Sequence, residues 1–403
     1  GHDVTRLHTV VLVGGQDKHK DFLAKLPDVF SDLSVRPVSD PLEEGQVHPH
    51  LTPGDGARWV LEPKHQEESH LWRPGVRLIA DPGRFPQTHH RSIPGLDLIE
   101  IEDFTQALVF QNSISAGFVG ALFSREETEI ERWLDNVEVG NAYVNRTVGG
   151  LTIGAHSVAG WKQAGVGAEL RFGHESLLSQ VTRWEQVDSP TRLGEVGPRV
   201  AHFLDLVSLW VSPEEHQWLT RAAQSDAAAR ETYRTVIDYS RHPAHVNFLR
   251  FHPYPQVTIR AGKDSRFVDV LRVFVAGLTV GVQSQVSLAP DVVAHLPHGS
   301  SSVPVLPRVL NDAAQVDNGG DQARLHGAWY VESLQEFLDR IDPEATNQRL
   351  RVVDSREAAA LYEALPGVEV TSTTVVQSGL VELQTFVRSQ VTCGYRFVVV
   401  PEG

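Results

Sequence analysis

One cysteine and nineteen histidines stand out among the side chains of this chain of 403 residues that could carry chemistry. A cysteine acts as a nucleophile or a metal ligand in its thiolate form, so its surroundings decide its use. Cys393 is the single cysteine, which excludes an internal disulfide and every cysteine-rich metal site. Such cysteine usage is typical of a reducing compartment, and we expect a cytoplasmic protein.

Six of the histidines and two glutamates crowd into an irregular region rich in proline and glycine. They are His48, His50, His65, His70, His89, His90, Glu67 and Glu68. Zinc requires three or four ligands that converge, with further groups that orient them. The region lacks the His-x-x-x-His spacing that places two imidazoles on one helix face. We therefore predict solvated loop histidines and no metal site.

The motif Gly165-Val166-Gly167 has the composition of a phosphate-binding turn. A dinucleotide fingerprint, however, has Gly-x-Gly-x-x-Gly directly after a strand. Leu170 takes the third glycine position here, and no clear strand precedes the motif. We interpret it as a glycine turn into a helix over residues 169–184.

Strands alternate with helices in the first half of the chain, which indicates an α/β fold with a mainly parallel sheet. Predicted strands cover 8–13, 76–80, 96–101, 118–123 and 141–145, and predicted helices cover 22–30, 103–111 and 125–137. The first strand enters its helix through Gly14-Gly15, a short glycine turn typical of α/β proteins.

The composition shifts to Asp, Ser, Pro, Gly and Glu around residues 186–197, which predicts a domain boundary. Helices are predicted over 200–210 and 212–239, the second opened by a Ser212 cap with Pro213 in its first turn. A second α/β series follows, with strands over 256–260, 285–288, 350–353 and 368–370 and helices over 267–278, 329–341 and 355–365. We therefore divide the chain into a domain of residues 1-188, a helical linker region of residues 189-246 and a domain of residues 247-403.

The net charge and the hydropathy of the chain argue against two classes of partner. Lys and Arg number 36 and Asp and Glu number 51, so the formal net charge is 36 − 51 = −15. No excess of cations exists to displace counterions from phosphates, and we expect no nucleic-acid partner. No apolar run approaches the ~20 residues that cross a bilayer, and we expect no transmembrane segment.

Several motifs follow one another in order between residues 5 and 185. They are Leu71-Trp72-Arg73-Pro74-Gly75-Val76, Pro82-Gly83, Gln111-Asn112, Ala116-Gly117-Phe118-Val119-Gly120, Gly140-Asn141-Ala142-Tyr143-Val144-Asn145-Arg146 and Gly160-Trp161-Lys162-Gln163-Ala164-Gly165. This series resembles the aldehyde dehydrogenase superfamily. More narrowly, it is similar to the L-glutamate γ-semialdehyde (Δ1-pyrroline-5-carboxylate) dehydrogenase module of bifunctional proline utilization A enzymes.

The second half carries motifs similar to the same enzymes, in Phe248–Thr258, Gly379–Leu383 and Phe386–Gln390. They resemble the C-terminal aldehyde-dehydrogenase-like domain of longer proline utilization A chains. In those chains the resemblance implies a Rossmann-like fold that covers the aldehyde module and its internal channel without performing chemistry. The expected fold class is α/β, an aldehyde-dehydrogenase catalytic-domain-like parallel sheet followed by a Rossmann-like C-terminal domain.

Three features that the resemblance implies are not found in this sequence. The family nucleophile is a cysteine in a Gly-Gln-x-Cys stretch before the strand that corresponds to His8–Val13, and Cys393 has no such context. Thr88-His89-His90-Arg91-Ser92 stands where the family has a glutamate that holds the nicotinamide ribose. Ser157-Val158-Ala159-Gly160 replaces Pro-Phe-Gly-Gly. The amino-terminal dinucleotide-binding half of the family fold has no counterpart either, so we predict no catalytic or cofactor-binding residue in this chain.

The resemblance implies a parent enzyme that oxidises L-glutamate γ-semialdehyde to glutamate with NAD⁺, next to a proline dehydrogenase module that carries FAD. The chain is then a C-terminal fragment of that enzyme, inactive alone because the nucleophile is absent. The alternative is a non-catalytic lid or oligomerisation scaffold with a decayed active site. Its partners are then its own N-terminal modules or a second copy in a homodimer.

One substrate-binding element is implied by the resemblance. Gly149 and Gly150 correspond to the family loop whose backbone N–H groups bind the substrate α-carboxylate. Backbone donors in a glycine turn can bind a carboxylate whatever the side chains are. A simple turn without a ligand is an equally good interpretation.

Overall fold

The computed structural model describes residues 7–31, 36–37, 56–66, 71–85, 95–148, 158–164, 170–172, 192–238, 245–296, 328–343 and 348–395. Two units make up the chain: Gly1–Glu138 with Ala142–Gly150 (unit 1), and Val139–Asn141 with Leu151–Gly403 (unit 2). The predicted domain limits at residues 188/189 and 246/247 stay a prediction, and the first of them lies outside the described residues.

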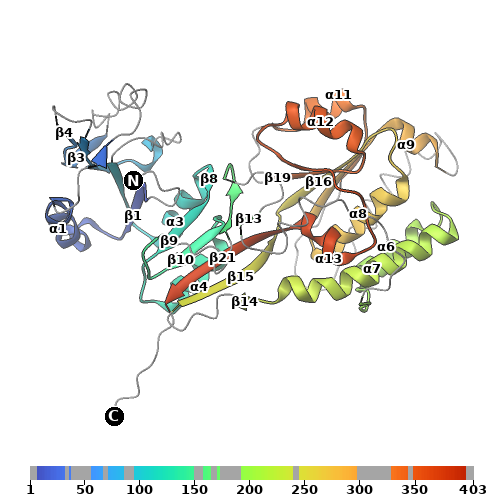
Figure 1. Cartoon of the computed structure of the whole chain (residues 1–403), viewed down its shortest axis with the longest axis horizontal. Coiled ribbons are helices and arrows are strands. Elements are labelled where there is room, and N and C mark those ends of the chain that lie inside the picture. Colours follow the sequence, from blue (N-terminus) through green and yellow to red (C-terminus); the bar gives the residue numbers. More distant parts are fainter. Residues whose placement is uncertain are drawn as a thin grey trace, which may run out of the picture. The chain divides into compact units, whose positions relative to one another are not determined.

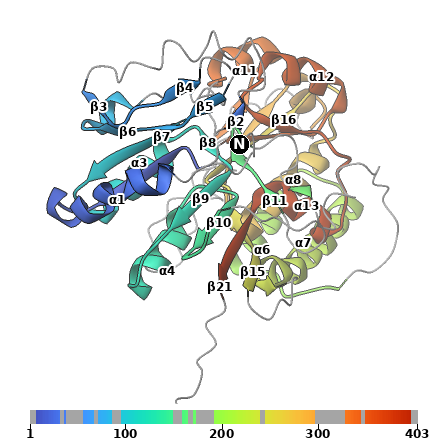
Figure 2. The same cartoon turned by 60° about the vertical axis from the view of Figure 1, so that its left-hand side comes forward.

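A four-stranded sheet organises unit 1, with its strands in the order β1-β7-β6-β3. They span Thr9–Val13 (β1), Gly95–Ile101 (β7), Gly75–Ile79 (β6) and Ala57–Leu61 (β3). β1, β7 and β6 are parallel, and β3 is antiparallel to β6 (Figure 2). Val76, Leu98 and Ile99 are fully buried, as expected where a parallel sheet is covered on both faces.

Helices follow the strands of unit 1, as the alternating pattern predicts. They are α1 (Lys20–Ser31), α3 (Phe104–Ser113) and α4 (Glu127–Asn136). The Asp103 carboxylate caps α3 by accepting from the Gln106 amide at 2.9 Å, which satisfies a backbone donor that the first helical turn leaves free. The Trp133 indole of α4 donates to Gln111 Oε1 of α3 at 2.8 Å, so a hydrogen bond joins the two helices.

A five-stranded parallel sheet organises unit 2, in the order β18-β17-β16-β19-β20. The strands span Gln256–Ala261 (β16), Gln283–Leu288 (β17), Trp329–Val331 (β18), Gln348–Val352 (β19) and Glu369–Thr371 (β20). Counted along the chain, this is the order 3-2-1-4-5, that of a doubly wound nucleotide-binding sheet. The predicted α/β class with parallel sheets is confirmed.

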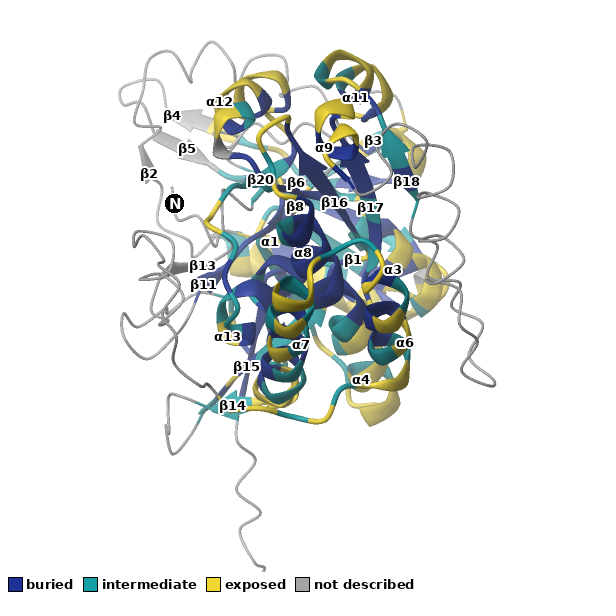
Figure 3. Cartoon of the chain, turned by 90° about the vertical axis from the view of Figure 1, so that its right-hand side faces the viewer, coloured by how far each residue is buried: buried dark blue, intermediate teal, exposed yellow. Residues whose placement is uncertain are grey.

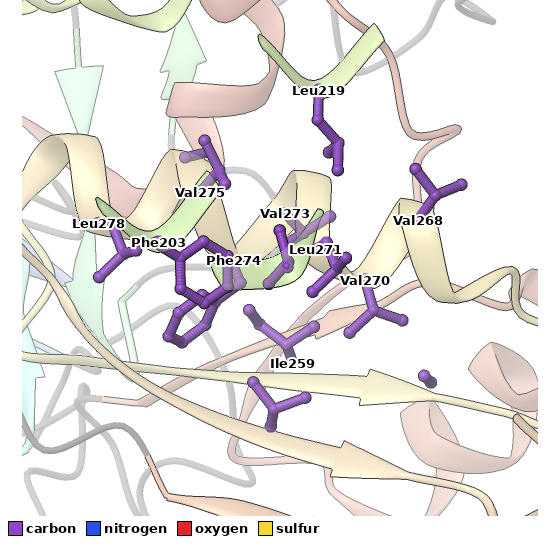
Figure 4. Close-up of a cluster of buried hydrophobic side chains, with 14 of the residues drawn as sticks. Phe203, Leu219, Ile259, Val268, Val270, Leu271, Val273, Phe274, Val275 and Leu278 are labelled. Carbon is purple, nitrogen blue, oxygen red and sulfur yellow. The ribbon is translucent and has the colours of Figure 1, made fainter. Parts of the chain in front are cut away.

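Helix α8 (Phe267–Val280) forms the centre of the unit 2 core. Eleven of its fourteen residues are buried, which is typical of a helix that is packed on all sides. Phe274 of α8 meets Phe203 of α6 (Pro198–Val207) with ring centroids 5.0 Å apart (Figure 4). Figure 3 shows α8 buried along its length, whereas α7 (Pro213–Arg234) exposes its outer side.

The start of α7 matches its sequence signal. The Ser212 hydroxyl accepts from the Glu215 amide at 3.2 Å, and the Glu215 carboxylate accepts from the Ser212 amide at 3.0 Å. This reciprocal capping box, with Pro213 in the first turn, confirms the predicted cap.

An antiparallel pair of long strands extends from the parallel sheet of unit 2 (Figures 1 and 2). β15 (His245–Pro253) and β21 (Val387–Tyr395) pair along their whole length, and β14 (Ile237–Asp238) pairs with β15. The sequence did not predict β21. Its polar residues Ser389 and Gln390 are buried, so no alternation of apolar and polar residues marks it.

Three predicted helices are wrong in part. The helix predicted over 212–239 ends at Arg234, and Ile237–Asp238 is strand β14. The segment predicted as one helix over 329–341 is strand β18 followed by the shorter helix α11 (Leu334–Arg340). Trp, Tyr and Val favour strands, and Ser333 with Glu336 forms a capping box that starts α11 after them. Leu170–Phe172 is strand β13, where a helix over 169–184 was expected. The rest of that segment lies outside the described residues.

Among the described helices, none combines the length and the apolar character that a membrane span requires.

Candidate functional site

The turn that leads to the predicted substrate-binding residues is described, whereas Gly149 and Gly150 themselves lie outside the described residues. The turn begins where β10 (Asn141–Val144) ends. Asn145 has a left-handed backbone there, with φ of 51°, which asparagine adopts more readily than most residues do. The direction in which the chain leaves β10 therefore depends on this residue.

The Asn145 side chain ties the turn to the end of β9 (Val119–Leu122). Its Nδ2 donates to the Ser124 carbonyl at 2.8 Å, and its Oδ1 accepts from the Ser124 amide at 3.0 Å. The Ser124 hydroxyl donates in turn to Glu129 Oε2 of α4 at 2.7 Å. Asn145 thus fixes the turn, a role that its place in the motif did not reveal.

Arg146 brings a positive charge to the same turn. It is buried, and its guanidinium carbon lies 5.5 Å from the centroid of the Tyr143 ring. A guanidinium group is a strong, directional partner of a carboxylate. A substrate contact at Gly149 and Gly150 stays a prediction.

Cys393 lies within β21, where its register partner is Asn247 of β15. It is 1% exposed. A thiolate nucleophile has to reach the carbon that it attacks, and a thiol closed off inside this pair of strands does not.

The described residues contain no group of three or more His, Cys, Asp or Glu that could hold a metal ion. Most of the histidine-rich region (His48, His50, His70, His89 and His90, with Glu67 and Glu68) lies outside them, and so does Gly165-Val166-Gly167. Only the backbone of His65 is described, in β4 (Lys64–Gln66). The absence of a metal site in that region stays a prediction.

Unit 2 has the topology that binds nucleotides in many α/β proteins. In the order 3-2-1-4-5 the connections of β16 and β19 leave in opposite directions, which opens a crevice at the carboxyl ends of these two strands. A dinucleotide site needs several glycines after the first strand and an acidic residue after the second. Residues 261–266 contain one glycine, Gly262, and β17 is followed by Ala289-Pro290.

Side chains of unit 2 fill this switch point. Arg260, fully buried in β16, donates from Nε to Glu357 Oε2 at 2.9 Å. Its Nη1 donates to Ser287 Oγ at 2.9 Å and to the Glu332 carbonyl at 3.0 Å. One arginine therefore joins three neighbouring elements across the crevice.

Gly262 shows how tightly the crevice is packed. A Cβ added there would lie 2.7 Å from Glu357 Cδ and 3.0 Å from Asp354 Oδ2. In a dinucleotide fingerprint the corresponding glycine lets the pyrophosphate approach the backbone, whereas here two carboxylates of the protein take that space. The residues at this switch point therefore do not fit NAD or FAD.

An ion pair at the surface connects the loop after β16 with the start of the helix that follows β19. Arg356 Nη1 of α12 (Ser355–Ala364) lies 2.6 Å from Asp264 Oδ2, in the loop after β16. The Arg356 side chain is 70% exposed, so the pair contributes at most about 1 kcal/mol. It nevertheless links the loop after β16 to α12.

Glu332 and Arg340 form a second, half-buried ion pair beside β18, with Oε1 and Nη2 2.6 Å apart. Burial alone would raise the pKa of Glu332, but hydrogen bonds from Arg340 and Ser287 outweigh it and lower the pKa. The same hydrogen bond raises the pKa of Arg340. Both groups therefore stay charged at neutral pH, and neither is poised for acid–base catalysis.

Comparison with known proteins gives a match in the region of the Asn145 turn. The model of the aldehyde dehydrogenase family matches residues 93–187. A 1-pyrroline-5-carboxylate dehydrogenase of Bacillus mycoides is 24% identical over 148 residues, 36% of this chain and 28% of that protein. An alpha-ketoglutarate semialdehyde dehydrogenase of Haloferax volcanii is 27% identical over 153 residues, 34% of this chain and 32% of that protein.

One solved structure shares the fold over nearly the whole chain. It is Proline Utilization A from Corynebacterium freiburgense, with a TM-score of 0.71 and 22% sequence identity over 98% of this chain and 36% of that one. The chain thus spans about a third of the length of the proteins that it matches. The predicted resemblance is confirmed: the aldehyde dehydrogenase family model matches residues 93–187, and the fold is shared with Proline Utilization A over nearly the whole chain.

Proposed function

We propose that this chain is the C-terminal part of an NAD-dependent L-glutamate γ-semialdehyde dehydrogenase of proline catabolism, of the proline utilization A type. The observation that carries the proposal is the family match over residues 93–187, which contains the Asn145 turn. Relatives named 1-pyrroline-5-carboxylate dehydrogenase support the substrate class. The fold shared with Proline Utilization A supports the combination with a second unit.

In this proposal the chain supplies substrate-binding backbone and not the chemistry of oxidation. The reaction needs a thiolate that attacks the aldehyde and a cofactor that accepts hydride. Cys393 is buried inside a pair of strands, and the switch point of unit 2 is filled by Glu357 and Arg260. The parent enzyme would bring NAD, and FAD in its proline dehydrogenase module, on segments other than these. A cytoplasmic location accords with this assignment.

A direct assay tests the proposal. The purified chain is mixed with NAD⁺ and L-glutamate γ-semialdehyde, and NADH is followed by its absorbance. We expect no NADH above the rate without protein, whereas the same chain fused to the segment encoded upstream of Gly1 turns over. Turnover by the chain alone would overturn the proposal that the nucleophile and the cofactor site lie on other segments of the parent enzyme. An upstream reading frame without a Gly-Gln-x-Cys motif would contradict the parent activity.

A non-catalytic lid or oligomerisation scaffold is the second candidate, and the filled crevice of unit 2 favours it. A nucleotide-type sheet whose switch point is occupied by its own ion pair is a surface for packing and not for a ligand. Its partners would be the parent's N-terminal modules or a second copy of the chain. Size-exclusion chromatography with light scattering checks this role. A strict monomer that does not bind the separately expressed upstream segment would contradict it.

A further inference from the structure

The segment between β20 and β21 is fastened to the core of unit 2 by buried arginines. Arg272 of α8 donates from Nε to the Val376 carbonyl at 2.9 Å and from Nη2 to the Gln377 carbonyl at 3.3 Å. Arg351 of β19 donates from Nη1 to the Thr373 carbonyl at 2.8 Å. The backbone that leads into β21 is therefore held by side chains of two core elements.

Each of these arginines is paired with a buried carboxylate. Arg272 Nη1 and Nη2 donate to the two oxygens of Asp226 on α7, both at 2.8 Å, and both side chains are 0% exposed. Arg351 Nε and Nη2 donate to Glu382 Oε1 at 3.1 and 3.0 Å. We call Asp226, Arg272, Arg351 and Glu382 the buried clasp.

A close backbone contact seats the same segment on α7. The Gly379 amide, at the start of α13 (Gly379–Glu382), donates to Ser225 Oγ at 2.9 Å. A Cβ on Gly379 would lie 2.5 Å from the Ser225 carbonyl oxygen and 2.6 Å from Asp226 Cα. Only glycine lets α13 approach α7 so closely.

The far end of this connection touches residues outside the parallel sheet. The Val391 amide of β21 donates to the Gly140 carbonyl at 2.8 Å. Gln390 Nε2 donates to the Val139 carbonyl at 2.9 Å, and the Trp161 indole donates to the Ser389 carbonyl at 2.6 Å. Val139, Gly140 and Trp161 belong to the segment that matches the aldehyde dehydrogenase family.

We propose that the buried clasp locks residues 373–395 onto the core of unit 2. When its ion pairs break, these residues detach as one piece and β21 leaves Gly140 and Trp161, while the parallel sheet stays folded. The clasp acts on backbone carbonyls of the connecting segment, so its loss acts first on that segment. β16, β17 and β19 keep their own strand pairing. The inference concerns the fold and stands whether or not the proposed function holds.

Cys393 is a built-in reporter of this opening. It is the single cysteine of the chain, it lies in β21, and it is 1% exposed. Its rate of reaction with an aromatic disulfide reagent under native conditions therefore measures how often β21 detaches. Hydrogen exchange, read on peptides of β21 and of β16, shows whether the opening is local.

The first variant is Asp226→Ala, which leaves Arg272 buried without its carboxylate. We expect Cys393 to react about 100-fold faster or more and the amides of β21 to lose protection, while those of β16 and β17 keep theirs. Equal loss of protection in β16, or an unchanged rate at Cys393, would overturn the proposal.

Glu357→Gln is the matched control, because it breaks the pair of the equally buried Arg260 without touching residues 373–382. We expect it to leave the Cys393 rate at the wild-type value, and acceleration equal to that of Asp226→Ala would count against the clasp.

Two further variants separate the lock from simple neutralisation of buried charge. Gly379→Ala pushes α13 away from α7 without changing any charge, and we expect it too to speed the reaction of Cys393. The double variant Asp226→Leu with Arg272→Met replaces the ion pair with apolar volume, but it leaves the Val376 and Gln377 carbonyls without their donor. Cys393 should still react faster than in the wild type. A return to the wild-type rate would show that the pair has no locking role.

Discussion

At the scale of single residues, Gly262 carries the argument that the switch point of unit 2 does not fit NAD or FAD. Its missing side chain makes room for Glu357, which the buried Arg260 holds in place. The close packing at Gly262 and the ion pair between Arg260 and Glu357 thus depend on each other. Mutations at the two positions should therefore be coupled.

We expect Gly262→Ala to lower the free energy of unfolding by about 1–3 kcal/mol, because its Cβ would lie 2.7 Å from Glu357 Cδ. Combined with Glu357→Ala, the loss should be smaller than the sum of the two single losses by about 1 kcal/mol or more. Urea unfolding of the wild type, the two single variants and the double variant measures this coupling.

Gly281→Ala is the control, because Gly281 has a φ of 91° but open space around it. The free energy of unfolding that it loses should therefore add to the loss caused by Glu357→Ala. Additive losses at Gly262 would contradict the crowded crevice.

At the scale of elements, we expect the contribution of Asp226, on α7, to the stability of unit 2 to depend on pH. Burial raises the pKa of Asp226 to about 7, against the opposing effect of Arg272, and the nearby Glu382 raises it further. The folded state therefore binds this proton more tightly than the unfolded state, where the pKa is ordinary. The stabilisation that comes from this group is fully present below the ordinary pKa of aspartate and is lost as the pH rises towards 7.

The prediction is a difference between two proteins. The free energy of unfolding of the wild type minus that of Asp226→Asn should fall as the pH rises from about 4 to about 7 and then level off. Asparagine keeps the shape of the side chain but does not titrate, so other ionisable groups cancel in the difference. Urea unfolding at several pH values measures it. A difference that rises with pH would show that the attraction of Arg272 outweighs the cost of burial.

Elements with a local signal were predictable from the sequence, and elements defined by distant partners were not. The capping box of Ser212 and Glu215 and the apolar strand β16 can each be read within a few residues. β21, in contrast, pairs with β15, a strand more than a hundred residues earlier in the chain. The site follows the same rule: Arg260 and Glu357 are 97 positions apart and Arg272 and Asp226 are 46 apart. A single sequence does not show which arginine meets which carboxylate.

At the scale of the whole molecule, the described residues of the two units have cores of very different size. Thirty buried residues of unit 2 form one apolar cluster around α8. The corresponding clusters in unit 1 contain six and four buried residues. Because stability grows with the apolar area that folding removes from water, the sheet of unit 1 should open under milder conditions than the parallel sheet of unit 2.

We therefore expect two transitions in urea, followed by hydrogen exchange on peptides of β7 for unit 1 and of β16 for unit 2. Leu98 and Leu271 are both fully buried, one in each unit. Replacing either by alanine should cost about 2–5 kcal/mol. Leu98→Ala should move the β7 transition alone to lower urea, and Leu271→Ala should move the β16 transition alone. If each substitution moved both transitions by the same amount, the two units would be one cooperative structure, and the difference between their cores would have no effect on unfolding.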